Sequence, residues 1–257
     1  MKKIILFTLL NIYFLLNVNS QILISLLLGD DLNSDKLEFG IETGVNFSSI
    51  GGLETTEYLR SWNIGFYFDL SIKENTPWNL YTGVLVKSGL GIDKLTKNDV
   101  KLLSENTIIY SDDGSYIQKI NTFIIPIFLK YKFNKSFFIE TGPQLDLMYN
   151  SWLEYEYETD NEYHLSKYNN KELFNKIDIG VGAGTGYRFK GRTGWTVGIK
   201  YYYGLTNAIK STDKSMNQSL FLKVNIPIGR SLEAQRKREA KKAKRETKRK
   251  AKLKENK

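Results

Sequence analysis

The sequence contains no cysteine, one histidine and four prolines in 257 residues. The absence of cysteine excludes disulfides, thiol catalysis, cysteine-ligated metal sites and a lipidated N-terminal cysteine. No run of about 18 apolar residues follows the N-terminal segment, and the mean hydropathy is −0.36, so the chain is not a polytopic helical membrane protein. A transmembrane β-barrel is compatible with these values, because only every second residue of its strands must be apolar.

The first twenty residues have the pattern of an export signal. Two lysines precede an apolar stretch over residues 4–16, and small residues stand before Gln21. We therefore predict a signal peptide over residues 1–20, cleaved after Ser20, and an N-terminal periplasmic segment over residues 21–36. An uncleaved anchor is the alternative, because the chain becomes apolar again directly after this point.

Two segments between Ile177 and Leu205 alternate between apolar and small or polar residues. A period of two is typical of extended strands with one apolar and one polar face. The polar positions are mostly glycine with isolated charges, which is typical of a strand between lipid and a narrow barrel lumen. The apolar positions are Ile177, Ile179, Val181, Ala183, Tyr187 and Phe189, then Trp195, Val197, Ile199, Tyr201, Tyr203 and Leu205.

Six further segments show the same alternation, which brings the predicted strand count to eight. The segment over residues 78–92 carries Lys87 on its polar side, and the segment over residues 120–133 is less regular. We predict an all-β fold, an eight-stranded antiparallel up-and-down transmembrane β-barrel over residues 37–228. The six segments cover residues 39–47, 62–72, 78–92, 120–133, 137–149 and 220–228.

The connections between these segments alternate between short and long. An up-and-down barrel with both chain ends on one side produces this pattern, with short periplasmic turns and long external loops. A β-sandwich has no reason to sort its connections in this way. The short turns lie near residues 73–77, 134–135 and 190–194, and the long connections near residues 48–60, 93–116, 150–175 and 206–216.

Alternation alone leaves two kinds of barrel open, one in a membrane and one in water. A secreted or periplasmic lipocalin-like barrel, which binds a small apolar ligand, keeps its apolar face inside. Glycine is unfavourable in a water-exposed strand but saves space in the lumen of an eight-stranded barrel, so we favour outer-membrane lipid as the surroundings. Aromatic residues near the strand ends fit two interfacial girdles: Phe47, Trp62, Trp78, Phe133, Phe137, Tyr149, Phe189 and Trp195.

The charged residues on the polar faces would all project into one lumen. Buried charges must pair, so we predict a hydrogen-bonded plug that holds the barrel rigid, and not an open channel. The predicted network comprises Glu38, Glu42, Asp69, Lys87, Lys130, Glu140, Asp146, Asp178, Arg188, Lys200 and Lys223.

The connection over residues 150–175 opens with alternating tyrosine and glutamate, which predicts that the flanking strands continue as a hairpin above the membrane. Alternate carboxylates on one strand face lie roughly 7 Å apart, too far to chelate one ion, so we predict no metal site and no cofactor. An exposed strand edge here would instead pair with another envelope protein. The candidate ligands weighed are Glu154, Glu156, Glu158, Asp160, Glu162 and His164.

The tail over residues 229–257 holds the excess positive charge of the chain. It carries 14 Lys and Arg residues against 4 Glu, whereas the net charge of the whole chain is +9. We expect a solvated tail, because it lacks an apolar stripe that could dock onto the barrel. The tail is nevertheless able to form a helix. Anionic cell-wall polymer and phospholipid headgroups are the partners available behind an exported barrel, and nucleic acid is not expected. A solubilising tail without a specific partner is the alternative.

Several segments resemble the PorT-like outer-membrane β-barrel proteins of Bacteroidetes. The resemblance covers about residues 37–228 and implies an outer-membrane barrel with no catalytic or ligand site to carry over. The chain differs in its long basic tail, because such barrels often end in an aromatic residue that the assembly machinery recognises. The similar segments are Ser20-Gln21 and residues 39–48, 124–133, 138–143, 180–189 and 202–207.

The function predicted from these patterns is not enzymatic. No Ser/His/Asp arrangement is visible, and we assign no catalytic residue and no cofactor-binding residue. We predict a structural, adhesive or complex-forming role through the external loops and the periplasmic tail. A cell-wall or polyanion binder that acts through the tail is a further alternative.

Overall fold

The computed structural model describes residues 37–73, 76–108, 110–134, 136–159, 162–189 and 194–228, together with Ala240 and Ala243. The predicted signal peptide, the segment before Leu37 and the rest of the basic tail lie outside the described residues. Within the described ranges no helix has both the length and the apolar character needed to cross a membrane.

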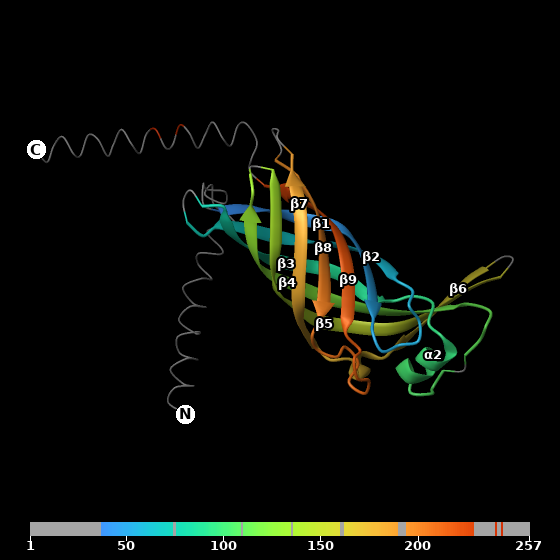
Figure 1. Ribbon diagram of the computed structural model, residues 1–257. Helices are drawn as coiled ribbons and strands as arrows, with labels where there is room; N and C mark the ends of the chain where they lie inside the picture. The colour runs from blue at the N-terminus through green and yellow to red at the C-terminus, as the bar shows by residue number, and fades with distance from the viewer. Residues whose placement is uncertain are drawn as a thin grey trace, which may run out of the picture.

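Nine strands occur in the described residues and form one antiparallel sheet (Figure 1). Two short helical elements, α2 (Lys97–Leu103) and the 3-10 turn η1 (Lys171–Leu173), lie in the connections. The strands are β1 (Leu37–Ile50), β2 (Leu59–Ser71), β3 (Trp78–Ile92), β4 (Ser115–Lys132), β5 (Phe137–Thr159), β6 (Glu162–Asn169), β7 (Ile177–Arg188), β8 (Thr196–Gly204) and β9 (Asn217–Pro227).

Eight of these nine described strands close into a ring. The order around the ring is β1-β2-β3-β4-β5-β7-β8-β9, and β9 pairs back to β1, with Gly40 opposite Pro227 and Ile50 opposite Asn217. Every pairing in the ring is antiparallel. Each joins strands that follow one another in the chain, except β5 with β7, which β6 separates in sequence, and β9 with β1, which close the ring. The predicted eight-stranded up-and-down barrel is therefore confirmed.

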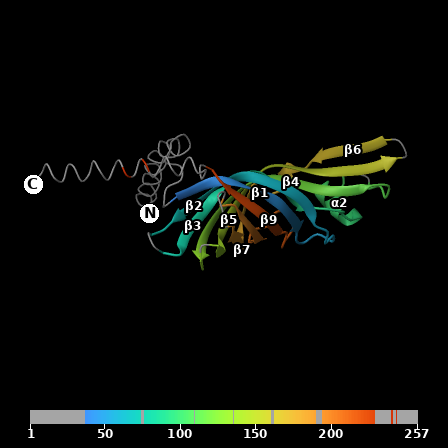
Figure 2. The same cartoon turned by 90° about the horizontal axis from the view of Figure 1, so that it is seen from above.

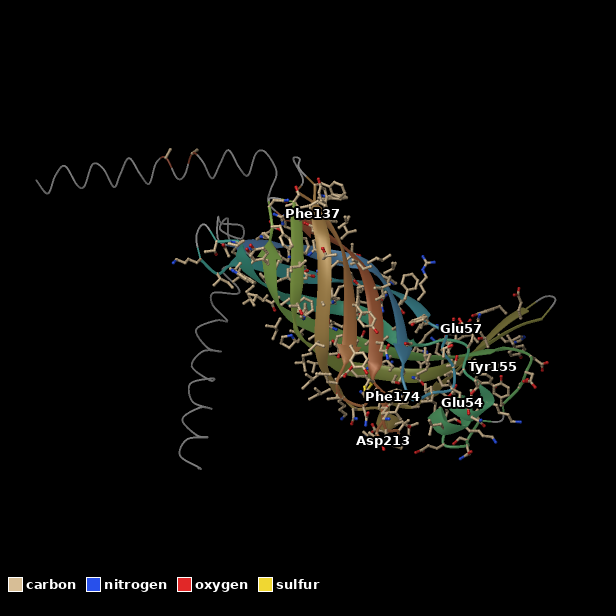
Figure 3. The ribbon with its side chains drawn as sticks, viewed as in Figure 1. Glu54, Glu57, Phe137, Tyr155, Phe174 and Asp213 are labelled. Carbon is tan, nitrogen blue, oxygen red and sulfur yellow. The ribbon has the colours of Figure 1, made fainter. Side chains whose placement is uncertain are left out.

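The two ends of the barrel differ as the alternating connections predicted. One end, here the turn end, carries the short connections after β2, β4 and β7, and β1 begins and β9 ends there. The other end, the loop end, carries the long connections, including α2 and η1. Figure 3 shows Phe137 at the turn end and Glu54, Tyr155 and Phe174 at the loop end.

The period of two along each strand separates the two faces of the wall. In β7 the residues from Ile177 to Ala183 alternate between exposed and buried, with Asp178, Gly180 and Gly182 buried and Ile179 and Val181 exposed. Apolar side chains therefore cover the outside, and polar side chains point into the lumen. This is the inverse of a lipocalin-like barrel, and it argues against that alternative.

One predicted inward charge was wrong. Lys87 is exposed on the outer face, and its ammonium lies 4.7 Å from the centre of the Trp62 ring. The cause is a bulge between Leu85 and Ser88, where β3 shifts register against β4. A bulge adds one residue to a strand and reverses the alternation, so Ser88 and Leu90 point inward beyond it.

Strands β4 and β5 run past the rest of the barrel at the loop end. β5 has 23 residues, whereas about 9–11 suffice to span a membrane, and its far end pairs with β6. The resulting three-stranded extension of β4, β5 and β6, here the arm, projects away from the ring (Figure 2). The predicted hairpin above the membrane is thus present, but its second strand is the separate strand β6 and not an extension of β7.

Candidate functional site

The turn end of the lumen is closed by ion pairs between distant strands. Arg188 of β7 donates to Glu38 of β1, and the Tyr67 hydroxyl donates to the same carboxylate at 2.9 Å. Asp69 of β2 accepts from Lys130 and Lys132 of β4, both at 3.2 Å. These contacts join β1, β2, β4 and β7, so the predicted rigid plug is present at this end.

The middle of the lumen is filled by charges and aromatic rings together. Lys223 of β9 pairs with Glu140 of β5, and Lys130 lies 3.4 Å from the same carboxylate. The Tyr81 hydroxyl donates to Glu42, and the Lys130 and Lys223 ammonium groups lie 3.9 and 4.3 Å from the centre of the Tyr81 ring. Each of these charges therefore has a nearby opposite charge or ring face, as buried charges require.

The glycines of the polar faces make room for these rings. A Cβ atom at Gly182 would lie 2.4 Å from the Phe128 ring, and one at Gly180 would lie 2.6 Å from the Tyr202 ring. Gly40 accommodates the Tyr67 ring in the same way. The prediction that these glycines save space in a crowded lumen is confirmed, because each is the surface on which an inward aromatic ring lies.

The loop end is sealed by an apolar cluster under α2. Thr96 and Asp99 form a capping box at the start of α2, and Val100 and Leu103 of its buried face pack into the cluster. The Asp99 carboxylate also accepts from the backbone N–H of Glu54 at 2.8 Å, which fastens α2 to the β1–β2 connection. The other buried members are Ile50, Leu85, Leu90, Ile92, Leu95, Tyr116, Ile120, Ile124, Leu153, Phe174, Tyr202, Ala208, Ile209 and Phe221.

Glu54 lies on the outer side of this seal. The Asn98 amide and the Thr96 hydroxyl donate to its carboxylate at 2.8 and 2.9 Å. These two hydrogen bonds lower the pKa of Glu54 below its ordinary value. The ionised form therefore helps to hold the β1–β2 connection against α2.

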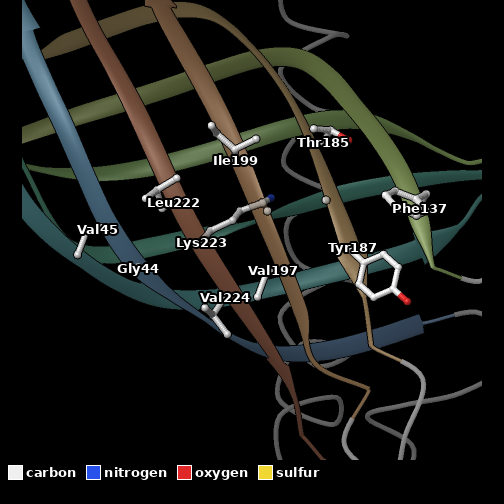
Figure 4. Close-up of a pocket in the computed structure, with 12 residues that line it drawn as sticks. Gly44, Val45, Phe137, Thr185, Tyr187, Val197, Ile199, Leu222, Lys223 and Val224 are labelled. Atoms are coloured by element: carbon white, nitrogen blue, oxygen red, sulfur yellow. The ribbon is translucent and has the colours of Figure 1, made fainter.

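The outer wall is a belt of exposed apolar side chains bounded by aromatic residues. At the turn end, Trp78 packs against Tyr131, and Phe137 packs against Tyr187. A groove of about 630 Å³ on this wall is lined mainly by apolar side chains and glycines of β1, β5, β7, β8 and β9 (Figure 4). Of the predicted girdle residues, those that are exposed are Trp62, Trp78, Phe133, Phe137, Tyr149, Phe189 and Trp195, whereas Phe47 is half-buried.

The arm carries a row of stacked rings on the face that continues the lumen side. Tyr110, Tyr116, Tyr155, Tyr157 and His164 follow one another with ring centres 4.5 to 5.3 Å apart. The rings come from three strands and the connection before β4, so the stack stiffens the arm beyond the end of the barrel.

The opposite face of the arm is charged and centred on Glu154. Lys119 and the Trp152 indole N–H donate to this carboxylate, and Lys167 lies 3.4 Å from it. Burial raises the pKa of Glu154, but these donors outweigh it and bring the value to about 2. Glu154 is thus committed to an ion-pair network within the arm.

The candidate metal ligands of this hairpin are not brought together. Among the described residues, no group of three or more His, Asp or Glu side chains is arranged to hold a metal ion. His164 lies in the ring stack, whereas Glu154 and Glu156 lie on the opposite face near Lys119. Asp160 lies outside the described residues.

A comparison with protein families identifies the chain. A model described as "Outer membrane protein beta-barrel domain" matches residues 30–210. The chain belongs to this family. As an outer membrane protein beta-barrel domain, it is located in the outer membrane, and the apolar belt is the surface that faces lipid.

Several solved outer-membrane proteins are similar to this outer membrane protein beta-barrel domain. Ail of Yersinia pestis, solved with the heparin analogue sucrose octasulfate, has 10% identity and a TM-score of 0.40, with 75% of this chain and 99% of that chain covered. Neisserial surface protein A has 9% identity and a TM-score of 0.35, with 73% and 96% covered. OprG of Pseudomonas aeruginosa has 9% identity and a TM-score of 0.33, with 74% and 91% covered. No curated protein matches the chain.

Proposed function

We propose that this outer-membrane barrel is a non-enzymatic recognition protein that binds another envelope protein through the arm. The observation that carries the proposal is the free edge of β6. Among the described strands β6 pairs with β5 alone, so no described strand covers its outer edge. An extended segment of a partner can add to such an edge as a further strand.

The side chains around this edge support recognition. Tyr163 and Leu165 of β6 are 61% and 44% exposed on the charged face of the arm. They lie beyond the girdle residue Tyr149 along the sheet, outside the part of β5 needed to span lipid. An apolar pair beside the charges of Glu154 and Lys167 offers both contact area and orientation to a protein partner.

The filled lumen supports a role at the surface of the barrel. Ion pairs close the turn end, aromatic rings fill the middle, and the apolar cluster under α2 seals the loop end. An eight-stranded barrel has an interior that is just filled by its own side chains. We therefore assign binding to the arm and structural support to the barrel.

Three finer assignments belong to the same proposal. Membership of the PorT-like group of Bacteroidetes and a signal peptide over residues 1–20 rest on the sequence patterns described above. The basic tail over residues 229–257 is proposed to bind anionic cell-wall polymer in the periplasm. Deletion of residues 231–257 is expected to abolish salt-sensitive binding to such polymer, and unchanged binding would remove this part of the proposal.

The arm is tested by a deletion that keeps the barrel. Tyr155 and Ser166 are paired across β5 and β6, so residues 156–165 can be replaced by an Asn-Gly turn that joins them. We expect the shortened protein to remain in the outer membrane but to lose its complex on a native gel. A lipid-facing variant, Ile179→Leu, serves as the control and should keep the complex. A complex that survives the deletion would refute the arm as the binding element.

A further inference from the structure

Two lumen carboxylates differ from the other four in the described residues. Glu38, Glu42, Asp69 and Glu140 each have a Lys or Arg partner within 4.0 Å. Asp146 of β5 and Asp178 of β7 have none within that distance among the described residues, although both are buried. In the described residues, neither aspartate therefore forms a direct ion pair with a Lys or Arg side chain.

These two aspartates are neighbours. Asp146 and Asp178 are register partners across β5 and β7, and both point into the lumen. Like charges directly opposite one another in a sheet are destabilising, and an uncompensated buried carboxylate is more costly still. The pair therefore needs a positive charge that the protein's side chains do not supply directly.

The hydrogen bonds around the pair leave oxygen atoms free. Asp178 accepts from Thr206 at 2.6 Å and from the Asn217 side-chain amide at 2.8 Å. One oxygen of Asp146 accepts from Gln144 at 2.9 Å, but its Oδ2 has no hydrogen-bond partner. The Oδ1 atom of Asn217 is also buried without a partner. Both of these atoms are acceptors, which a cation satisfies, and the buried Tyr202 hydroxyl beside Asp178 is a further polar group that can donate to this carboxylate.

A small cavity lies at this position. It has a volume of about 20 Å³, room for about one water molecule or one dehydrated ion. Its polar lining residues are Thr122, Asp146, Asn175, Asp178 and Asn217, and Phe174 belongs to the apolar side that seals it from the loop end. Its polar lining residues carry carboxylate, amide and hydroxyl oxygen atoms, the ligand type preferred by hard cations.

We propose that this cavity binds one small monovalent cation of the size of sodium, held between Asp146 and Asp178. Lys200 donates to Gln144 at 3.0 Å, and Gln144 in turn donates to Asp146, so one positive charge is already coupled to the pair. One further positive charge balances the two carboxylates. The bound ion ties β5 and β7 to Asn217 at the start of β9, and so locks the wall beneath the loop-end seal.

The test compares sodium with a cation that is too large for the cavity. The full-length protein in detergent micelles is heated in sodium chloride or in choline chloride at the same concentration. The transition temperature is the temperature at which the protein no longer migrates on a gel as the folded form. For a dissociation constant of about 10 mM, sodium at about 150 mM should raise this temperature by about 3–6 °C. Equal transition temperatures in the two salts would overturn the proposal.

Two near-isosteric variants locate the effect. Asp146→Asn and Asp178→Asn should each lose the difference between sodium and choline, whereas Asp112→Asn, an exposed aspartate in the β3–β4 connection, should keep it. A sodium effect that persists in both lumen variants would place the ion elsewhere and refute the site. If Asp146→Asn raises the transition temperature while the unmodified protein does not respond to sodium, the pair shares a proton and the cation proposal fails. If neither variant folds, the salt comparison on the unmodified protein decides alone.

Discussion

The contact between Gly182 and Phe128 gives a prediction in which the sign of the effect is diagnostic. Gly182 has an ordinary strand backbone, since it is not among the glycines with positive φ in the described residues. In an open strand position, Gly→Ala therefore stabilises by about 0.5–1 kcal/mol, because alanine restricts the unfolded chain more. Here the added Cβ would lie 2.4 Å from the Phe128 ring, which is fully buried.

The expected result for Gly182→Ala is a loss of stability. Overpacking of a filled core costs about 1–3 kcal/mol, so the net change in the free energy of unfolding should be a decrease of about 1–2 kcal/mol. In a Phe128→Leu background the shorter side chain removes the clash, and the same substitution should be neutral or stabilising by about 0.5 kcal/mol. The coupling between the two positions is then about 2 kcal/mol.

The assay is urea unfolding of the protein in lipid vesicles, followed by tryptophan fluorescence. Ala183→Val is the matched control, because Ala183 is the next residue of β7 and faces lipid. It should change the free energy of unfolding by less than about 0.5 kcal/mol. If Gly182→Ala stabilises the protein with Phe128 in place, the Phe128 ring does not pack against this glycine, and the description of the lumen packing is wrong.

Three further substitutions test the ion pairs, the arm and the lipid belt. Arg188→Gln leaves Glu38 without its guanidinium partner and should lower the free energy of unfolding in urea by about 3 kcal/mol. Arg188→Lys should recover part of this lost stability. An unchanged free energy of unfolding in Arg188→Gln would contradict a closed turn end. Because the pKa of Glu154 is lowered from 4.5 to about 2, its ionised form stabilises the arm above about pH 4.5 and this contribution disappears as the pH falls toward 2. Hydrogen exchange of the β6 amides should therefore accelerate over that range more in the unmodified protein than in Glu154→Gln, and equal profiles would count against the network. Val181→Arg places a charge in the middle of the apolar belt and should cost about 2–4 kcal/mol in the same urea assay, while a change below about 0.5 kcal/mol would show that this face is in water.

The alternation of β7 and β8 was sufficient to predict the wall of the barrel. A period of two fixes which side chains share a face, and glycine on the polar face, together with aromatic residues near the strand ends, showed which face lies inside. The same local rule failed at Lys87, because it assigns every second residue of β3 to one face, whereas the bulge depends on how β3 and β4 pair. The alternation rule also could not identify the ion-pair partners of Glu38 and Asp69, since these partners come from strands distant in sequence.

The arm and the plug show a second limit. The Tyr and Glu alternation after Tyr149 predicted continued strand structure, but not that its partner would be the separate strand β6. The irregular residues Ile124 and Phe128 were a signal of the lumen's aromatic and apolar filling, because both point inward where a polar residue was expected. That no Lys or Arg of the described residues forms an ion pair with Asp146 could be recognised only from the three-dimensional arrangement of the lumen.

The most direct test of the central claim is the electrophoretic mobility of the protein extracted from outer membranes, with and without boiling. A closed barrel with a lipid-facing belt should be recovered in the outer-membrane fraction, and the unboiled sample should migrate faster than the boiled one, because the paired strands resist the detergent. Recovery as a soluble protein whose mobility does not change on boiling would contradict the account.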